Sequence, residues 1–314
     1  MKGPDPVKVG VTLGSRAPDT LAAMAGRIEA LGYDSIWVGD HVQFHNPTLE
    51  SLTVLSHVAA LTRRVRLGTA VYLLALRHPT LVAKTVATLD VLAGGRVVFG
   101  VGVGGEFPRE FEAVGVPHRE RGPRVDEGIE VCRLLWTKAP ASFEGRFVRF
   151  ADVALEPRPL QPGGPPIWIG GRSDHALRRA ARAGDGWISY VVTPERYRRS
   201  LETILTLAAA AGRRIEPGRG FEPAHLAFTV VDDDWERARA TAAEFLSRQY
   251  HQPFDDLVTR YCVLGPPSQC VETLARFVEA GVRTLVIGFS AGADRAEEQV
   301  ERFAADVLPS IRRM

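Results

Sequence analysis

Short apolar segments alternate with longer amphipathic segments along the whole chain. Eight of the apolar segments are rich in β-branched residues, the first from Val7 to Leu13 and the last from Thr284 to Ser290. Each is followed, in one case after an insertion, by apolar residues at helical spacing, which is typical of βα units and a parallel sheet. Eight such units predict a single α/β domain over residues 1–314 with the fold of a (β/α)8 TIM barrel. An open doubly wound sheet is the alternative, because periodicity does not show whether the sheet closes.

Three regions do not follow this repeat, and we expect them to be insertions in the barrel. They lie near residues 106–124, 140–165 and 250–266, and the second contains a hairpin predicted from Ser142 to Phe150. Barrel enzymes keep their active sites at the C-terminal ends of the strands, in loops that vary between proteins. We therefore place the insertions at the C-terminal face. The choice of substrate depends on the first and third of them and on the loop from Val42 to Glu50, which carry no recognisable motif.

The charge balance excludes partners that need a strongly charged protein surface. The chain has 39 Lys and Arg residues against 37 Asp and Glu residues, a net charge of +2, whereas binding nucleic acid or a membrane surface needs a field of one sign. No stretch approaches the roughly 18 apolar residues of a membrane span, and the N-terminus has no apolar signal core. The three cysteines, Cys132, Cys262 and Cys270, form no CxxC pair and are odd in number. We therefore expect a cytoplasmic protein in a reducing compartment.

Two ionisable residues stand at the end of the second predicted strand. Asp40 and His41 directly follow the segment Ser35 to Gly39, and His45 comes four residues later. A histidine can accept or donate a proton near neutral pH, and a neighbouring carboxylate can fix its tautomer or bind a ligand donor. A loop-capping role for His41 is the alternative. A metal site on these side chains is disfavoured, because the first strand ends in Leu13-Gly14-Ser15 and offers no further ligand.

The fourth predicted strand is rich in glycine. Gly100, Gly102 and Gly105 match the spacing of the dinucleotide-binding fingerprint. That motif needs a helix at its last glycine, whereas Glu106-Phe107-Pro108 follows here, so we reject it. Glycines within a strand leave room for a close backbone or a flat ligand. Together with Gly104 they predict a wall of bare backbone at the barrel mouth, against which a planar ring can lie.

The fifth predicted strand, Pro165 to Gly171, passes directly into a helix. Its last two residues, Gly170 and Gly171, are followed by Arg172, so unpaired N–H groups and a guanidinium meet at one helix N-terminus. A phosphate group binds well at such a place. A plain turn, with Ser173 as the helix cap, is the alternative. A glycine-rich strand beside an anion-binding helix end is typical of a site for a flat cofactor with a phosphate tail.

Several stretches of the chain, in their order and spacing, resemble the luciferase-like oxidoreductases that depend on a flavin or on the deazaflavin coenzyme F420. The matching stretches are EALGYDSIWVGDHV, LTRRVRLGTAVYLLALRHPTLVAKTVATLDVLAGGRVVFGVGVGG, REFEAVG, PPIWIGG, GDGW and LARFVEAGVRTLVIG. The resemblance covers nearly the whole chain. It implies a (β/α)8 barrel, a cofactor ring over its C-terminal mouth and, commonly, a homodimer.

The resemblance also assigns roles to particular residues. In the family, the acidic residue after the second strand contacts the cofactor ring and the adjacent histidine faces the substrate, which correspond to Asp40 and His41. A non-proline cis peptide pressed against the ring corresponds to the bond between Ala70 and Val71. The phosphate-binding glycines correspond to the two that end the fifth strand. The full set of predicted cofactor-binding residues is Asp40, Ala70, Val71, Gly102, Gly104, Gly170, Gly171 and Arg172.

The motif pattern is more similar to the F420 branch of the family than to the luciferase branch, which uses reduced FMN and oxygen. The luciferase branch has an arginine where this chain has Val103. Some F420 members place a proton-donating glutamate after the fourth strand, and Glu106 lies one residue beyond that position. The resemblance therefore predicts hydride transfer between coenzyme F420 and a small organic substrate, with His41 and Glu106 as catalytic residues and no metal.

Two other functions are alternatives. One is a two-component monooxygenase that uses FMNH2 and O2 and receives reduced FMN from a separate flavin reductase. The other comes from a different class and is a non-redox barrel lyase or isomerase in which Asp40 and His41 act as an acid-base pair.

Overall fold

Within residues 6–14 and 18–314, which the computed structural model describes, eight parallel strands close into a barrel. They follow one another in chain order, and the last joins the first, so the ring of strands has no open edge. This closure confirms the predicted (β/α)8 barrel and excludes the open sheet. The barrel strands are β1 (Lys8–Thr12), β2 (Ser35–Val38), β3 (Arg66–Thr69), β5 (Val97–Gly102), β8 (Ile167–Gly170), β9 (Gly186–Tyr190), β11 (Gly220–Val231) and β13 (Thr284–Phe289).

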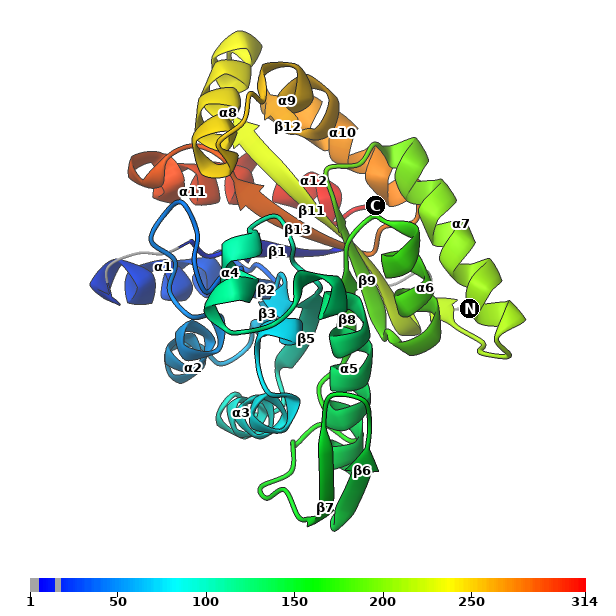
Figure 1. Ribbon diagram of the computed structural model, residues 1–314. Coiled ribbons are helices and arrows are strands. Elements are labelled where there is room, and N and C mark those ends of the chain that lie inside the picture. Colours follow the sequence, from blue (N-terminus) through cyan, green and yellow to red (C-terminus); the bar gives the residue numbers. More distant parts are fainter. Residues whose placement is uncertain (1–5, 15–17) are drawn as a thin grey trace.

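Helices surround the barrel, as Figure 1 shows. They bury apolar side chains against the strands, as the helical spacing in the sequence predicts. Ser173 caps α6 as predicted, because its hydroxyl oxygen accepts a hydrogen bond from the backbone N–H of Ala176. No helix among the described residues is long and apolar enough to cross a membrane. The outer helices are α1 (Pro18–Ala30), α2 (Ser51–Leu61), α3 (Pro79–Leu92), α5 (Arg121–Thr137), α6 (Asp174–Ala183), α7 (Pro194–Ala210), α10 (Pro267–Glu279) and α11 (Ala296–Asp306).

The third predicted strand is interrupted. The sequence predicts one strand from Val65 to Leu73, whereas the structure has β3 and a separate short strand, β4 (Tyr72–Leu73). Between them, the peptide bond from Ala70 to Val71 is cis, at the position that the family resemblance assigned. β3 pairs with the beginning of β5 and β4 pairs with its end, so the chain keeps contact with β5 across the interruption.

The first two insertions lie at opposite faces of the barrel. Region 106–124 follows β5 and contains α4 (Pro108–Ala113), so it lies at the C-terminal face as predicted. Region 140–165 connects α5 to the beginning of β8, and a segment that precedes a strand lies at the N-terminal face. The prediction was therefore wrong for this region. It does contain the predicted hairpin, formed by the antiparallel strands β6 (Ala141–Glu144) and β7 (Arg149–Val153), which extends away from the barrel (Figure 1).

The third insertion is longer than the predicted region 250–266. After β11 the chain forms α8 (Trp235–Tyr250), α9 (Asp255–Tyr261) and β12 (Val263–Gly265), which pairs with the end of β11. These elements bury an apolar cluster of their own, and α10 then completes the βα unit. The remaining elements are β10 (Glu216–Pro217), α12 (Leu308–Ile311) and the 3-10 turns η1 (Leu74–Leu76), η2 (His118–Glu120) and η3 (Ala293–Arg295).

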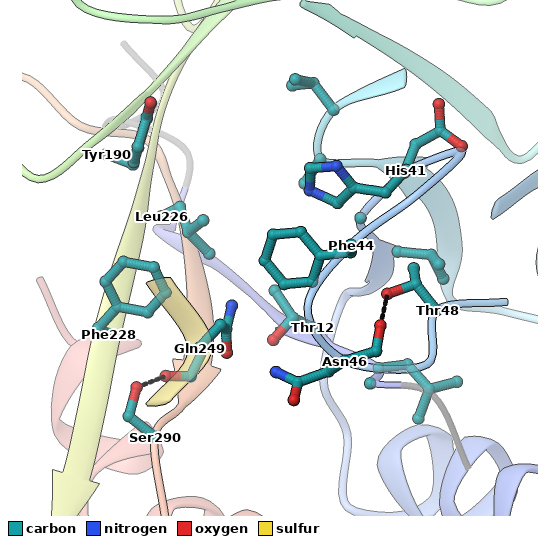
Figure 2. A pocket seen from close by; sticks show the side chains of 18 of the residues that line it. Thr12, His41, Phe44, Asn46, Thr48, Tyr190, Leu226, Phe228, Gln249 and Ser290 are labelled. Carbon is teal, nitrogen blue, oxygen red and sulfur yellow. Dashed lines mark hydrogen bonds between the residues drawn. The ribbon is translucent and has the colours of Figure 1, made fainter. Parts of the chain in front are cut away.

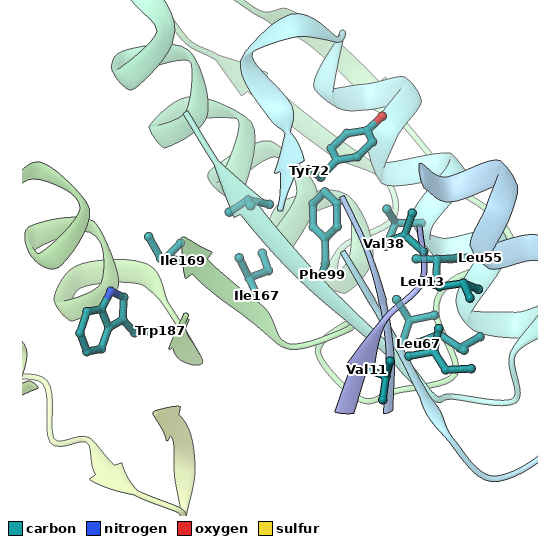
Figure 3. Close-up of a cluster of buried hydrophobic side chains, with 14 of the residues drawn as sticks. Val11, Leu13, Val38, Leu55, Leu67, Tyr72, Phe99, Ile167, Ile169 and Trp187 are labelled. Atoms are coloured by element: carbon teal, nitrogen blue, oxygen red, sulfur yellow. The ribbon is translucent and has the colours of Figure 1, made fainter. Parts of the chain in front are cut away.

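Two tryptophans fill the inside of the barrel. The rings of Trp37 and Trp168 lie 4.9 Å apart, and a Cβ atom on Gly68 or Gly186 would collide with them. A larger apolar core, which includes Phe99, lies between the strands and the outer helices (Figure 3). Because the interior is filled by these rings, the C-terminal mouth is the part of the barrel that remains for a ligand.

Candidate functional site

A cavity of about 640 Å³ lies at the C-terminal mouth of the barrel. Figure 2 shows His41 and Phe44 on one side of it and Tyr190 and Phe228 across from them. Of the predicted site residues, Arg172 is the one outside its lining. The predicted residues that line the cavity are Asp40, His41, Ala70, Val71, Gly102, Gly104, Glu106, Gly170 and Gly171.

His41 is held by a buried carboxylate that the sequence analysis did not predict. Glu110, on α4, is 1% exposed, and its Oε1 atom lies 3.2 Å from Nδ1 of His41. The same carboxylate accepts hydrogen bonds from the backbone N–H groups of Val42 and Gln43. Burial raises the pKa of Glu110, but these hydrogen bonds and the charge of His41 outweigh burial, so the pKa lies below its ordinary value. The ionised carboxylate fixes Nδ1 of His41 and leaves Nε2 directed toward the cavity (Figure 2).

The carboxylate of Asp40 is saturated by partners within the chain. Its oxygens accept two hydrogen bonds from the guanidinium of Arg77, at 2.5 and 2.9 Å, and one each from the Leu73 backbone and the Ser51 hydroxyl. Burial raises the pKa of Asp40, and the positive charge of Arg77 opposes that rise. Arg77, which no sequence pattern indicated, thereby ties the end of β2 to the segment after the cis peptide. Contact between Asp40 and a cofactor ring stays a prediction.

The glycines of the barrel mouth make room for a side chain as well as for backbone. A Cβ atom on Gly102 would overlap the side chain of Val71, and one on Gly170 would come within 2.6 Å of Val71 Cγ1. A Cβ atom on Gly104 would have a methyl group of Leu73 as its nearest neighbour, at 3.2 Å. The expectation of a bare backbone wall was therefore wrong at Gly102, which the side chain of Val71 covers. The side chain of Val71 lies over both Gly102 and Gly170 and forms part of the cavity wall.

Replacing Gly102 with alanine should destabilise the protein by about 1–3 kcal/mol, because the added methyl group overpacks the space that Val71 occupies. The double variant Gly102→Ala, Val71→Ala should recover most of this loss. Urea unfolding measures both changes. Gly26→Ala is the matched control: it lies on α1, where an added Cβ meets nothing within 4 Å, and should be neutral or stabilising. A Gly102→Ala variant as stable as the wild type would show that Val71 is not fixed over Gly102.

The end of β8 combines an unusual backbone conformation with a helix N-terminus. Gly171 has a φ of 122°, and a Cβ atom there would lie 3.0 Å from the Cβ of Ala176 in the first turn of α6. The guanidinium of Arg172 donates a hydrogen bond to the carbonyl of Val191 at 2.7 Å and lies over the ring of Tyr190. A phosphate contact by Arg172 stays a prediction.

Glu106 lies in the cavity wall with a partner that the sequence did not indicate. The hydroxyl of Tyr190 donates a hydrogen bond to Glu106 Oε1 at 2.9 Å. Burial, together with the negative charge of Glu106, raises the pKa of Tyr190 to about 12. Tyr190 is thus a neutral donor that holds the carboxylate at the cavity. A catalytic role for Glu106 stays a prediction.

Comparison with known proteins identifies the family. The sequence profile of luciferase-like monooxygenases matches residues 5–284. The chain belongs to this family. This luciferase-like chain is 30% identical, over 343 aligned residues and 98% of both chains, to an F420-dependent glucose-6-phosphate dehydrogenase of Kineococcus radiotolerans. It is also 30% identical over 299 residues, 84% of this chain and 79% of the other, to an FMNH2-dependent dimethylsulfone monooxygenase of Pseudomonas putida.

A solved structure shares the luciferase-like fold. An F420-dependent secondary alcohol dehydrogenase, in complex with an F420-acetone adduct, superimposes with a TM-score of 0.85 at 21% identity, over 98% of this chain and 99% of the other. The resemblance drawn from the sequence is thereby confirmed, and so is the fold. The relatives are flavin- and deazaflavin-dependent oxidoreductases, and the two cofactors in their names are the two that the sequence analysis predicted.

Proposed function

We propose that this protein is an F420-dependent oxidoreductase that transfers hydride between coenzyme F420 and a small organic substrate. The observation that supports it most is the placement of His41, which Glu110 holds at Nδ1 beside a cavity large enough for a ring and a small molecule. A relative that is 30% identical over 98% of both chains is named as an F420-dependent dehydrogenase. Family membership also favours redox chemistry over the lyase or isomerase alternative.

The residues at the mouth fit a flat ring with an anionic tail. Gly171 has a left-handed backbone conformation and no Cβ atom, so its bare backbone lies next to the beginning of α6. The N-terminus of a helix carries partial positive charge and unpaired N–H groups, which favour phosphate. In this proposal Gly170, Gly171 and the first turn of α6 hold the phosphate, and Val71 with Gly104 supports the ring.

The chain itself supplies positioning and proton transfer, while F420, when bound, supplies the hydride chemistry. Nε2 of His41 is directed toward the cavity, so it can take the proton of a substrate hydroxyl group or return one to a carbonyl oxygen. Glu110 orients the imidazole through Nδ1. Glu106, held by Tyr190, is a second group on the cavity wall that can exchange a proton.

A second candidate is a two-component FMN monooxygenase, which would use FMNH2 and O2 with a separate flavin reductase. It is favoured by the dimethylsulfone monooxygenase that shares 30% identity with 84% of this chain. The two candidates place a ring in the same cavity and differ in whether oxygen is consumed.

The setting of the enzyme is also part of the proposal. We propose one cytoplasmic domain over residues 1–314 that works as a homodimer. The single barrel that runs from β1 to β13 supports the one domain, and the free cysteines, Cys132, Cys262 and Cys270, fit a reducing compartment. Gel filtration with light scattering tests the dimer.

Titration of the purified protein with oxidised F420 tests the proposed cofactor. We expect saturable quenching of F420 fluorescence or a shift of its absorption spectrum, and weaker binding of FMN measured in parallel. Tight binding of FMN without any response to F420 would contradict the proposal. Oxygen uptake with FMNH2 supplied by a flavin reductase would then support the monooxygenase.

A further inference from the structure

The surface next to His41 is aromatic. The ring of Phe44 stacks on the imidazole of His41, with centroids 4.2 Å apart and planes at 19°. The ring of Tyr250 meets Phe44 edge-on at 6.5 Å, and Phe228 meets Tyr250 edge-on at 6.3 Å. We call Phe44, Tyr250 and Phe228 the aromatic wall, and all three line the cavity.

The aromatic wall is assembled from three separate parts of the chain. Phe44 lies in the loop after β2, Phe228 lies on β11, and Tyr250 is the last residue of α8, in the inserted segment. Leu226 continues the apolar surface beside Phe228, across the cavity from His41 and Phe44 (Figure 2). A molecule that reaches His41 therefore lies between apolar surfaces on both sides, where aromatic rings stack well.

Charge on the same lining disfavours an anionic substrate. Among the described residues that line the cavity, the one lysine or arginine is Arg248, whose side chain is 73% exposed and paired with Glu244 at 2.6 Å. Asp40, Glu106 and Glu110 add three carboxylates to that lining. A phosphate group beside His41 would lose its hydration without gaining a buried cation among these residues.

We infer that the substrate is a neutral alcohol or carbonyl compound with an aromatic substituent, and not a sugar phosphate. The inference rests on the proposed function, which gives His41 the role of exchanging a proton with the oxygen of the substrate. The ring of the substrate packs against the aromatic wall, and its hydroxyl or carbonyl oxygen faces Nε2 of His41. Because one relative is named as a glucose-6-phosphate dehydrogenase, glucose 6-phosphate is the compound against which this substrate class has to be tested.

Isothermal titration calorimetry on the protein, with and without F420, tests the inference with acetophenone, acetone and glucose 6-phosphate as probes. We expect acetophenone to bind at least about tenfold more tightly than either other probe, the scale of one buried aromatic contact. Phe44→Ala should weaken acetophenone binding about tenfold and change acetone binding less. Leu81→Ala, an exposed apolar residue on α3, is the control and should change neither.

Two results would overturn the inference: glucose 6-phosphate binding as tightly as acetophenone, or a Phe44→Ala variant with unchanged acetophenone affinity. Failure of every probe to bind would overturn it as well. The F420 titration tests the cofactor proposal independently of the substrate class. A protein that prefers acetophenone but does not bind F420 would contradict the cofactor proposal alone, whereas one that binds F420 and prefers the sugar phosphate would contradict the substrate class alone.

Discussion

Replacing His41 with alanine should lower kcat about 100-fold or more and leave the affinity for F420 nearly unchanged. The reason is that His41 is the group directed toward the substrate oxygen, and loss of a general acid or base costs about 100-fold or more. The cofactor, in contrast, is expected to rest on Val71 and Gly104 and on the two glycines at the end of β8. Steady-state kinetics gives the first quantity and F420 fluorescence titration gives the second.

One further variant and one control test whether the loss of activity comes from His41 itself. Glu110→Gln removes the charge beside His41 but keeps a side chain of similar size at Nδ1, so we expect a smaller loss of kcat than in His41→Ala. His57→Ala, an exposed histidine on α2, is the matched control and should behave as the wild type. A His41→Ala variant with full activity would remove His41 from the mechanism.

The repeat pattern was sufficient to predict the barrel but not the segments added to it. Strand and helix periodicity located every barrel strand, because each βα unit has to bury one face on its neighbours. Periodicity could not separate α8 from a barrel helix, since α8 also buries an apolar face, against α9 and β12. The hairpin at residues 141–153 was predicted correctly but placed at the wrong face. It follows a helix and precedes β8, and segments in that position lie at the N-terminal face of a barrel.

The candidate site was predicted in part. His41 and Asp40 were found because ionisable residues at the end of an apolar strand are costly without a use. Glu110 and Arg77 were missed because they reach those residues from segments 69 and 37 positions further along the chain, and no local pattern encodes that contact. The predicted glycines line the cavity, but Gly102 is not the bare backbone that we expected. A sequence shows which residue lacks a side chain and does not show that Val71 fills the space.

Replacing Arg77 with methionine should lower the free energy of unfolding by about 3–5 kcal/mol near neutral pH. Asp40 is 2% exposed, and removal of its charged partner leaves a buried carboxylate with the Leu73 N–H and the Ser51 hydroxyl as its donors. In the variant, folding favours protonated Asp40, whose pKa burial already raises. A raised folded-state pKa makes stability fall as pH rises, so the deficit should be larger at pH 7 than near pH 4.5. Urea unfolding at both pH values measures it.

Comparison variants test whether the burial of Asp40 causes the loss of stability in Arg77→Met. Arg149→Met breaks an ion pair with Glu144 in the hairpin, where both side chains are about three-quarters exposed, and should change stability by less than about 0.5 kcal/mol. The double variant Arg77→Met, Asp40→Leu removes both buried charges and should be more stable than Arg77→Met alone. A deficit equal to that of Arg149→Met would show that water reaches Asp40.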